Sequence, residues 1–175
     1  MKIILISGER GTGKTTIAKR VAKELGYIYY SDFAILNGLK INHSIQGGDD
    51  GTIILINAYK KFFNEHINEN IVVDCETTIL PSRVKVLQTE FDIDAIFLCF
   101  DGISEEELIE QLKVKKTSMP LGKIKNQAWG LLELGKKIKL MCEEENIKFQ
   151  SINKNRSLVI ENLSNELINR YKNMV

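Results

Sequence analysis

The sequence predicts a single α/β domain in which helices cover both faces of a five-stranded parallel sheet. Short β-rich runs alternate with longer helical patterns along the 175 residues, and this alternation is typical of parallel strands joined by crossover helices. A chain of this length forms one sizeable core and leaves little room for a second. We therefore expect residues 1–175 to form one three-layer α/β/α domain.

Five short runs rich in β-branched and aromatic residues are predicted as the strands. They are residues 2–6, 27–30, 71–74, 95–100 and 147–152. Six further segments have helical periodicity or helix-end signals, such as Gly26, Pro81 and the S-x-x-E capping box that begins at Ser104. These predicted helices are residues 15–25, 52–67, 81–89, 104–115, 126–146 and 158–171.

Residues 8–15 have the pattern G-x-x-x-x-G-K-T between the first predicted strand and the first helix. In such a turn, successive backbone N–H groups wrap phosphate groups, and the helix adds the positive end of its dipole. Lys14 is expected to reach the β- and γ-phosphates of a nucleoside triphosphate, and the Thr15 hydroxyl to hold Mg²⁺. The predicted nucleotide-binding residues are Gly8, Glu9, Arg10, Gly11, Thr12, Gly13, Lys14, Thr15 and Thr16.

A magnesium site of this type also needs a carboxylate at the end of a neighbouring buried strand. Asp74 ends the third predicted strand, so it is the predicted second ligand, although a solvated strand-end aspartate is the alternative. Glu76 follows two residues later and is placed to position water or substrate. The loop and this carboxylate together predict the P-loop NTPase fold, with ATP and Mg²⁺ at the carboxyl ends of the strands.

Several segments resemble P-loop kinases, the group that includes nucleoside monophosphate kinases and shikimate kinase, and the resemblance covers nearly the whole chain. The segments are Ile4-Leu5-Ile6-Ser7-Gly8, the loop itself with Thr16, Leu25-Gly26-Tyr27, Ser31-Asp32 and Val73-Asp74. The resemblance implies an enzyme that transfers the γ-phosphoryl group of ATP to a small hydroxyl- or phosphate-bearing acceptor.

The resemblance also implies where the acceptor binds. In such kinases an acidic residue beyond the second strand holds or deprotonates the attacking hydroxyl, and Asp32 has this position; an N-cap of the following segment is its structural alternative. Arg83 is the candidate for an acceptor phosphate or carboxylate. The glycine-rich stretch 37–51 is predicted to be a long connection within an acceptor-binding insertion, residues 37–68. The side chains that either line this pocket or only pack in the core and loops are Phe33, His43 and Tyr59.

P-loop kinases also have a lid, commonly with arginines, that closes over the transferred group. The corresponding segment, residues 113–126, has five lysines and neither an arginine nor an acidic residue. Lysine neutralises phosphate charge but lacks the bidentate fork of arginine. Lys115, Lys116 and Lys123 are therefore the lid candidates, and a solvated basic face is the alternative.

Asn153-Lys154-Asn155-Arg156 follows the last predicted strand, where these kinases often place the loop over the nucleotide base. The segment partly matches the N-K-x-D motif of GTP-binding proteins. Arg156 stands where the guanine-specific aspartate is required, so ATP is the predicted nucleotide.

The composition excludes other classes. Lysine and arginine total 24 against 23 acidic residues, so no global field attracts nucleic acid or a membrane. Three widely spaced cysteines predict neither a disulfide framework nor a zinc site, and the absence of a long apolar run predicts a cytoplasmic protein.

Two alternative functions stay open. One is a nucleotide-dependent switch or regulatory ATPase that acts through partner binding. The other is a polynucleotide 5′-kinase, in which residues 113–139, with eight lysines against Glu133 alone, would follow a phosphate backbone. Trp129 is the only aromatic residue in that segment, so nucleic acid is the less expected partner.

Overall fold

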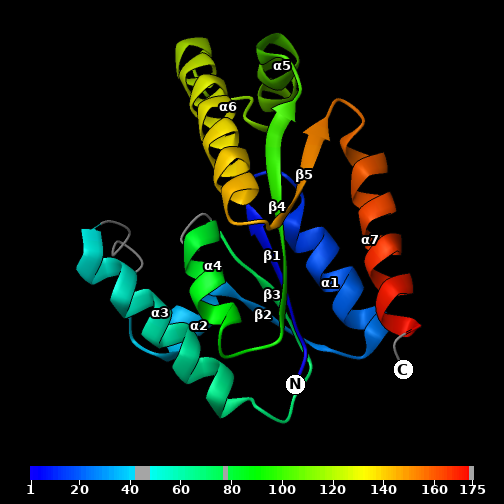
Figure 1. The fold of residues 1–175 in the computed structure, drawn as a ribbon. Coiled ribbons are helices and arrows are strands. Elements are labelled where there is room, and N and C mark those ends of the chain that lie inside the picture. The colour runs from blue at the N-terminus through cyan, green and yellow to red at the C-terminus, as the bar shows by residue number, and fades with distance from the viewer. Residues whose placement is uncertain (42–47, 77–78, 174–175) are drawn as a thin grey trace.

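The structure, a computed structural model, describes residues 1–41, 48–76 and 79–173 and contains one five-stranded parallel sheet (Figure 1). The strand order is β2-β3-β1-β4-β5, and every neighbouring pair is parallel. The strands are β1 (Ile3–Gly8), β2 (Ile28–Ser31), β3 (Ile71–Asp74), β4 (Ile93–Gly102) and β5 (Lys148–Asn153). The predicted five-stranded parallel sheet is confirmed.

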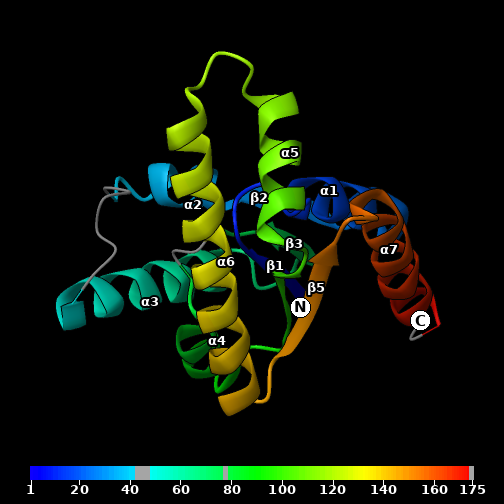
Figure 2. The ribbon, with the colours of Figure 1, turned by 90° about the horizontal axis from the view of Figure 1, so that it is seen from above.

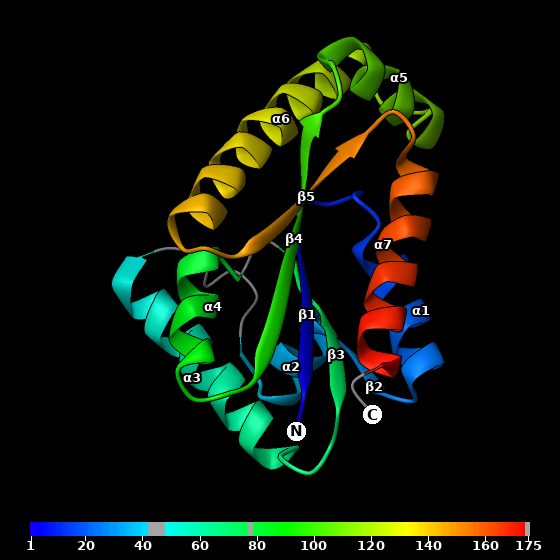
Figure 3. The same ribbon diagram turned by 45° about the vertical axis from the view of Figure 1, so that its right-hand side comes forward.

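The helices form layers on both sides of this sheet (Figure 3). One side carries α1 (Lys14–Leu25) and α7 (Arg156–Lys172), and the other carries α2 (Asp32–Gly38), α3 (Gly48–Glu65) and α4 (Pro81–Gln88). The two remaining helices, α5 (Glu105–Lys115) and α6 (Leu121–Glu144), lie side by side as a hairpin at the end of β4 (Figures 1 and 2). The C-terminal part of α6 runs back along β4, where Ile138 and Cys142 join the core on the side of α4. None of the helices in the described ranges is long and apolar enough to cross a membrane.

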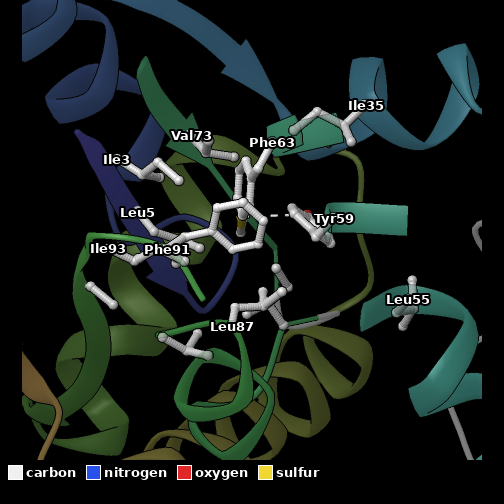
Figure 4. Close-up of a cluster of buried hydrophobic side chains, with 14 of the residues drawn as sticks. Ile3, Leu5, Ile35, Leu55, Tyr59, Phe63, Val73, Leu87, Phe91 and Ile93 are labelled. Carbon is white, nitrogen blue, oxygen red and sulfur yellow. Dashed lines mark hydrogen bonds between the residues drawn. The ribbon is translucent and has the colours of Figure 1, made fainter. Parts of the chain in front are cut away.

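Alternation along β1 divides the core between the two layers. Ile3 and Leu5 belong to the cluster that α2, α3 and α4 cover, whereas Ile4 and Ile6 belong to the cluster beneath α1 and α7. Successive side chains of a strand point to opposite faces, so a strand such as β1, which is apolar from Ile3 to Ile6, is buried on both faces. Figure 4 shows Ile3 and Leu5 in the first cluster, beside Phe63 and Phe91.

Several helix ends form as the sequence predicts. The Ser104 side chain accepts a hydrogen bond from the Glu107 N–H, and the Glu107 side chain accepts one from the Ser104 N–H, which completes the capping box of α5. Gly26 ends α1 with φ 68°, in the left-handed region. Pro81 opens α4. The three cysteine thiols are free and buried: Cys75, Cys99 and Cys142.

The structure departs from the prediction most clearly at three helices. Helix α2 was not predicted; it begins directly after β2, because Ser31 accepts a hydrogen bond from the Ala34 N–H and caps it. Helix α3 begins at residue 48, inside the predicted connection, although residues 42–47 lie outside the described part. Helix α6 begins at residue 121 rather than 126, because Pro120 serves as its N-cap.

Candidate active site

The phosphate loop joins β1 to α1 at the carboxyl edge of the sheet. Gly8, Gly11 and Gly13 have φ angles of 127°, 89° and 106°, which L side chains rarely adopt. A Cβ at Gly8 would lie 2.2 Å from the Leu98 carbonyl oxygen, and one at Gly13 would lie 2.4 Å from Ile160 Cδ1. The backbone therefore keeps its cradle only with glycine at these two positions.

Lys14 begins α1 and points back into this loop. Its side chain is 6% exposed, and Nζ donates a hydrogen bond of 2.9 Å to the Glu9 carbonyl oxygen. Burial lowers the pKa of Lys14, while the charges of Asp74 and Glu76 oppose this effect. The ammonium group is thus already inside the cradle, where a phosphate chain would take over its contact with the carbonyl oxygen.

Thr15 and Asp74 meet at the ends of neighbouring elements. The Thr15 hydroxyl donates a hydrogen bond to Asp74 Oδ2, and the Tyr29 hydroxyl donates a longer one of 3.4 Å to the same oxygen. Burial and the Asp74 charge raise the pKa of Tyr29 to about 12, so this phenol remains a neutral donor.

The donor set fits Mg²⁺. A hydroxyl and a carboxylate are the hard oxygen ligands that this ion prefers. Residues 1–41, 48–76 and 79–173 contain no group of three or more His, Cys, Asp or Glu side chains that could hold a metal. A sparse protein site is typical of magnesium that is held partly by nucleotide phosphates. The assignment of Thr15 and Asp74 as its ligands stays a prediction.

Asp32 lies at the same sheet edge, because Asp74 is in register with both Ser31 and Ile6. Ser31, not Asp32, is the N-cap of α2, so the capping alternative for Asp32 is wrong. The Asp32 carboxyl is 4% exposed, and its Oδ1 accepts a hydrogen bond of 2.6 Å from the Tyr59 hydroxyl.

The partner of Asp32, Tyr59, is fully buried in the hydrophobic cluster of Figure 4. Its hydroxyl also lies 3.5 Å from Cys75 Sγ, and burial raises its pKa well above the usual value. Tyr59 is therefore a core residue that holds Asp32 in place. Phe33, in contrast, is exposed, and His43 lies outside the described residues.

Arg83 lies at the start of α4 and is buried. Its Nη2 donates a hydrogen bond of 2.9 Å to Thr52 Oγ1, which ties α4 to α3. Burial lowers its pKa. Contact with an acceptor molecule stays a prediction for this residue.

Glu9 was predicted to bind the nucleotide, but its side chain turns away from the cradle. It is fully buried, and Oε2 accepts a hydrogen bond of 2.6 Å from the Phe100 N–H. Oε1 has no hydrogen-bond partner in the described part of the chain. Burial raises the pKa of Glu9 to about 7, although the Phe100 hydrogen bond and the Lys14 charge act in the opposite direction. The Glu9 side chain thus contacts β4 and α6, while its carbonyl oxygen accepts the hydrogen bond from Lys14.

Two cavities lie near the phosphate loop: the larger between α5 and the start of α7, and the smaller between the loop and the α5–α6 hairpin. The larger, about 680 Å³, is lined by Gln111, Val114, Lys115, Lys154, Asn155, Arg156, Ser157 and Leu158. The smaller, about 290 Å³, is lined by Arg10, Gly11, Phe100, Leu108, Gln111, Leu112, Lys115, Lys116, Gln127 and Leu131.

Two of the three predicted lid lysines line the cavities, and the third does not. Lys115 belongs to both cavities, and Lys116 lines the smaller one, where its Nζ donates a hydrogen bond of 2.8 Å to Gln127. Lys123 is exposed on α6 and lines neither cavity. Residues 113–126 are mostly helical, so only residues 116–120 form a loop.

A phosphate-binding role for Arg156 was not predicted from the sequence. The fold brings its guanidinium beside the phosphate loop, where Nη2 would lie 3.7 Å from a Cβ at Gly13. Helix α7 packs against α1, which brings Arg156 close to Gly13 although the two residues are far apart in the sequence. The available signal was the position of Arg156 directly after the last predicted strand, because all strands of a parallel sheet end at the same edge.

The comparisons with known proteins agree with this geometry. The model of the family "ATPase family associated with various cellular activities (AAA)" matches residues 4–73. No curated protein matches the sequence. A shikimate kinase from Bacteroides thetaiotaomicron superimposes with a TM-score of 0.61 at 16% identity, over 99% of this chain and 97% of that one.

Two further solved structures are similar over their full lengths. A gluconokinase from Sinorhizobium meliloti has a TM-score of 0.61 at 17% identity, covering 99% of this chain and 95% of its own. An uncharacterized protein from Eubacterium ventriosum has a TM-score of 0.63 at 15% identity, covering 98% of both chains. Likeness at such identities establishes the fold, so the chain has the P-loop NTPase fold and the predicted resemblance to P-loop kinases is confirmed at that level.

Proposed function

We propose that this protein is a phosphotransferase that moves the γ-phosphoryl group of ATP to a small hydroxyl- or phosphate-bearing acceptor. The observation that carries the proposal is the hydrogen bond between Thr15 and Asp74 beside the buried Lys14. A chance glycine-rich turn requires neither the lysine nor the strand-end carboxylate, whereas a nucleotide site requires both.

The residues have separate roles in this proposal. The loop N–H groups and Lys14 bind the β- and γ-phosphates, and Thr15 and Asp74 hold Mg²⁺, which would neutralise charge on the same phosphates. Asp32, held by Tyr59, orients the acceptor hydroxyl and accepts its proton. Catalysis then rests mainly on positioning and on neutralisation of charge.

Two structural relatives support a small acceptor. Both the shikimate kinase and the gluconokinase have names that give a small organic molecule as their acceptor, and each covers nearly the whole chain. A polynucleotide acceptor has less support, because three of the eight lysines in residues 113–139 are paired with carboxylates of this chain. These lysines are Lys113, Lys136 and Lys139.

A screen of ATP consumption tests the proposal. Wild-type protein with Mg²⁺ is incubated with sugars, small hydroxy acids, nucleosides, nucleotides and a 5′-hydroxyl oligonucleotide, and transfer is followed as labelled phosphate on the acceptor. We expect one small-molecule class to accept phosphate and Lys14→Met to abolish transfer. Lys23→Met, an exposed lysine on the same helix, is the matched control.

Two other results of this screen would support the alternative functions. Transfer to the oligonucleotide alone would establish a polynucleotide kinase and refute the small acceptor. ATP binding without transfer to any class would favour a nucleotide-dependent switch.

A further inference from the structure

Arg156 is the one arginine that the fold places beside the phosphate loop from the far end of the chain. It is the first residue of α7, and its Nη2 would lie 3.7 Å from a Cβ at Gly13. The same position on Gly13 is 2.4 Å from Ile160 Cδ1, one turn further along α7. The first turn of this helix therefore packs directly on the loop, with the guanidinium at the edge of the larger cavity.

Arg156 has no partner of opposite charge among the residues that the structure describes. Its Nε is buried without a hydrogen-bond partner, and no ion pair in residues 1–41, 48–76 and 79–173 includes it. Arg170 on the same helix is paired with both Asp94 and Glu166. A half-buried guanidinium without a carboxylate is unfavourable unless an anion binds it.

A second cation faces Arg156 across the larger cavity. Lys115, at the end of α5, lines the same cavity and also has no ion pair among the described residues. Burial and then the charge of Arg156 lower the pKa of Lys115, so the two side chains repel each other. An anion between them would remove both the repulsion and the unsatisfied donor.

We propose that Arg156 and Lys115 form a clamp on the phosphate chain of the donor nucleotide, in which Arg156 supplies the arginine that the α5–α6 hairpin lacks. The ligand class follows from position, because the clamp borders Gly13 of the phosphate loop and opens into a cavity of about 680 Å³. The clamp rests on the proposed function only in taking a nucleoside triphosphate as the ligand. It accounts for the absence of arginine from residues 113–126.

Binding measurements separate a phosphate clamp from a contact with the base. Titration calorimetry with ATP, ADP and adenosine at constant Mg²⁺ is applied to the wild type, Arg156→Met and Lys115→Met. Loss of a hydrogen bond between charged groups weakens binding about 10- to 100-fold, so we expect this loss for ATP and ADP with Arg156→Met. Lys115→Met, at an exposed position, should weaken ATP binding about 1.5- to 5-fold. Adenosine binding should change less than about twofold in both variants.

A cation at the far end of α7 provides the control for these binding measurements. Lys172→Met removes a cation from the other end of α7 and should leave ATP affinity unchanged. Unchanged ATP affinity in the Arg156 and Lys115 variants, or an equal loss for adenosine, would overturn the clamp. Should Arg156→Met fail to fold, Lys115→Met and Arg156→Lys decide the question, since both retain most of the packing.

The same titrations distinguish failure of the clamp from failure of the proposed function. A wild-type protein that binds ATP, with variants that bind it equally well, would refute the clamp alone. A wild-type protein that does not bind ATP would refute both.

Discussion

The substitution Glu9→Gln should change how the stability of this protein depends on pH. Glu9 is fully buried beneath the phosphate loop, with one carboxyl oxygen hydrogen-bonded to Phe100 and the other without a partner in the described residues. Glutamine has the same shape and keeps an oxygen acceptor for the Phe100 N–H, but it cannot ionise. The variant therefore isolates the free energy of burying the charge.

The magnitude follows from the pKa of Glu9, which burial raises from 4.5 to about 7. Between these values the folded state binds more protons than the unfolded state, so the free energy of unfolding falls as pH rises. One pKa unit corresponds to about 1.36 kcal/mol, which gives about 3 kcal/mol over the whole interval. The loss is complete above pH 7, when the buried carboxylate is charged.

Urea denaturation of the wild type and Glu9→Gln between pH 4.5 and 8.5 measures this effect as a difference. Other titrating groups contribute alike to both proteins and cancel. We expect Glu9→Gln to gain about 3 kcal/mol relative to the wild type between the two ends of this range. Glu161→Gln, on the exposed side of α7, controls for the exchange of a carboxyl for an amide. A difference that stays constant with pH would refute the assignment of a raised pKa to Glu9.

Two further predictions concern the loop and the acceptor side. Gly8→Ala should lower the free energy of unfolding by about 3 kcal/mol or more, because its Cβ would lie 2.2 Å from a backbone oxygen. Gly130→Ala is its control in the same denaturation assay, where open space around a helical glycine predicts a gain of about 1 kcal/mol; equal effects would contradict the steric argument. Tyr59→Phe should remove about 1–3 kcal/mol of stability by deleting the buried hydrogen bond from the Tyr59 hydroxyl to Asp32, and it should lower kcat without raising the KM for ATP. A variant with unchanged stability and kcat would show that this hydrogen bond does not hold Asp32.

Much of the fold could be predicted because local signals and burial agree. The runs that became β1 and β3 are buried at every position, as the central strands of a parallel sheet should be. The capping box at Ser104 and the glycine at position 26 fixed helix ends through backbone hydrogen bonds with near neighbours. The short helix α2 has one hydrogen-bonding cap and only seven residues, too little for periodicity to show.

The two halves of the candidate site differed in how far the sequence could predict them. Lys14 and Thr15 follow from a motif whose spacing is local, and Asp74 follows because strands of one parallel sheet end together. Glu9 was assigned with its loop neighbours, but the direction of its side chain depends on a space opened by Gly135 on α6, where a Cβ would lie 2.8 Å from Glu9 Oε2. Because Glu9 and Gly135 lie far apart in the sequence, no local sequence pattern predicts that they fit together.

The absence of arginine from residues 113–126 does not mean that the folded site lacks an arginine, because the cations of a site can come from segments far apart in the sequence. By sequence the hairpin has lysines only, which suggests a weakened hold on the donor phosphates. In the fold, α7 brings Arg156 to the loop from the opposite side of the cavity, close enough to lower the pKa of Lys115. A cationic side chain on a packed helix loses less conformational entropy when it binds a ligand than a cationic side chain on a lid that must close. The hairpin therefore differs from the family pattern in lacking an arginine, but the positive charge can still be supplied by Arg156 on α7.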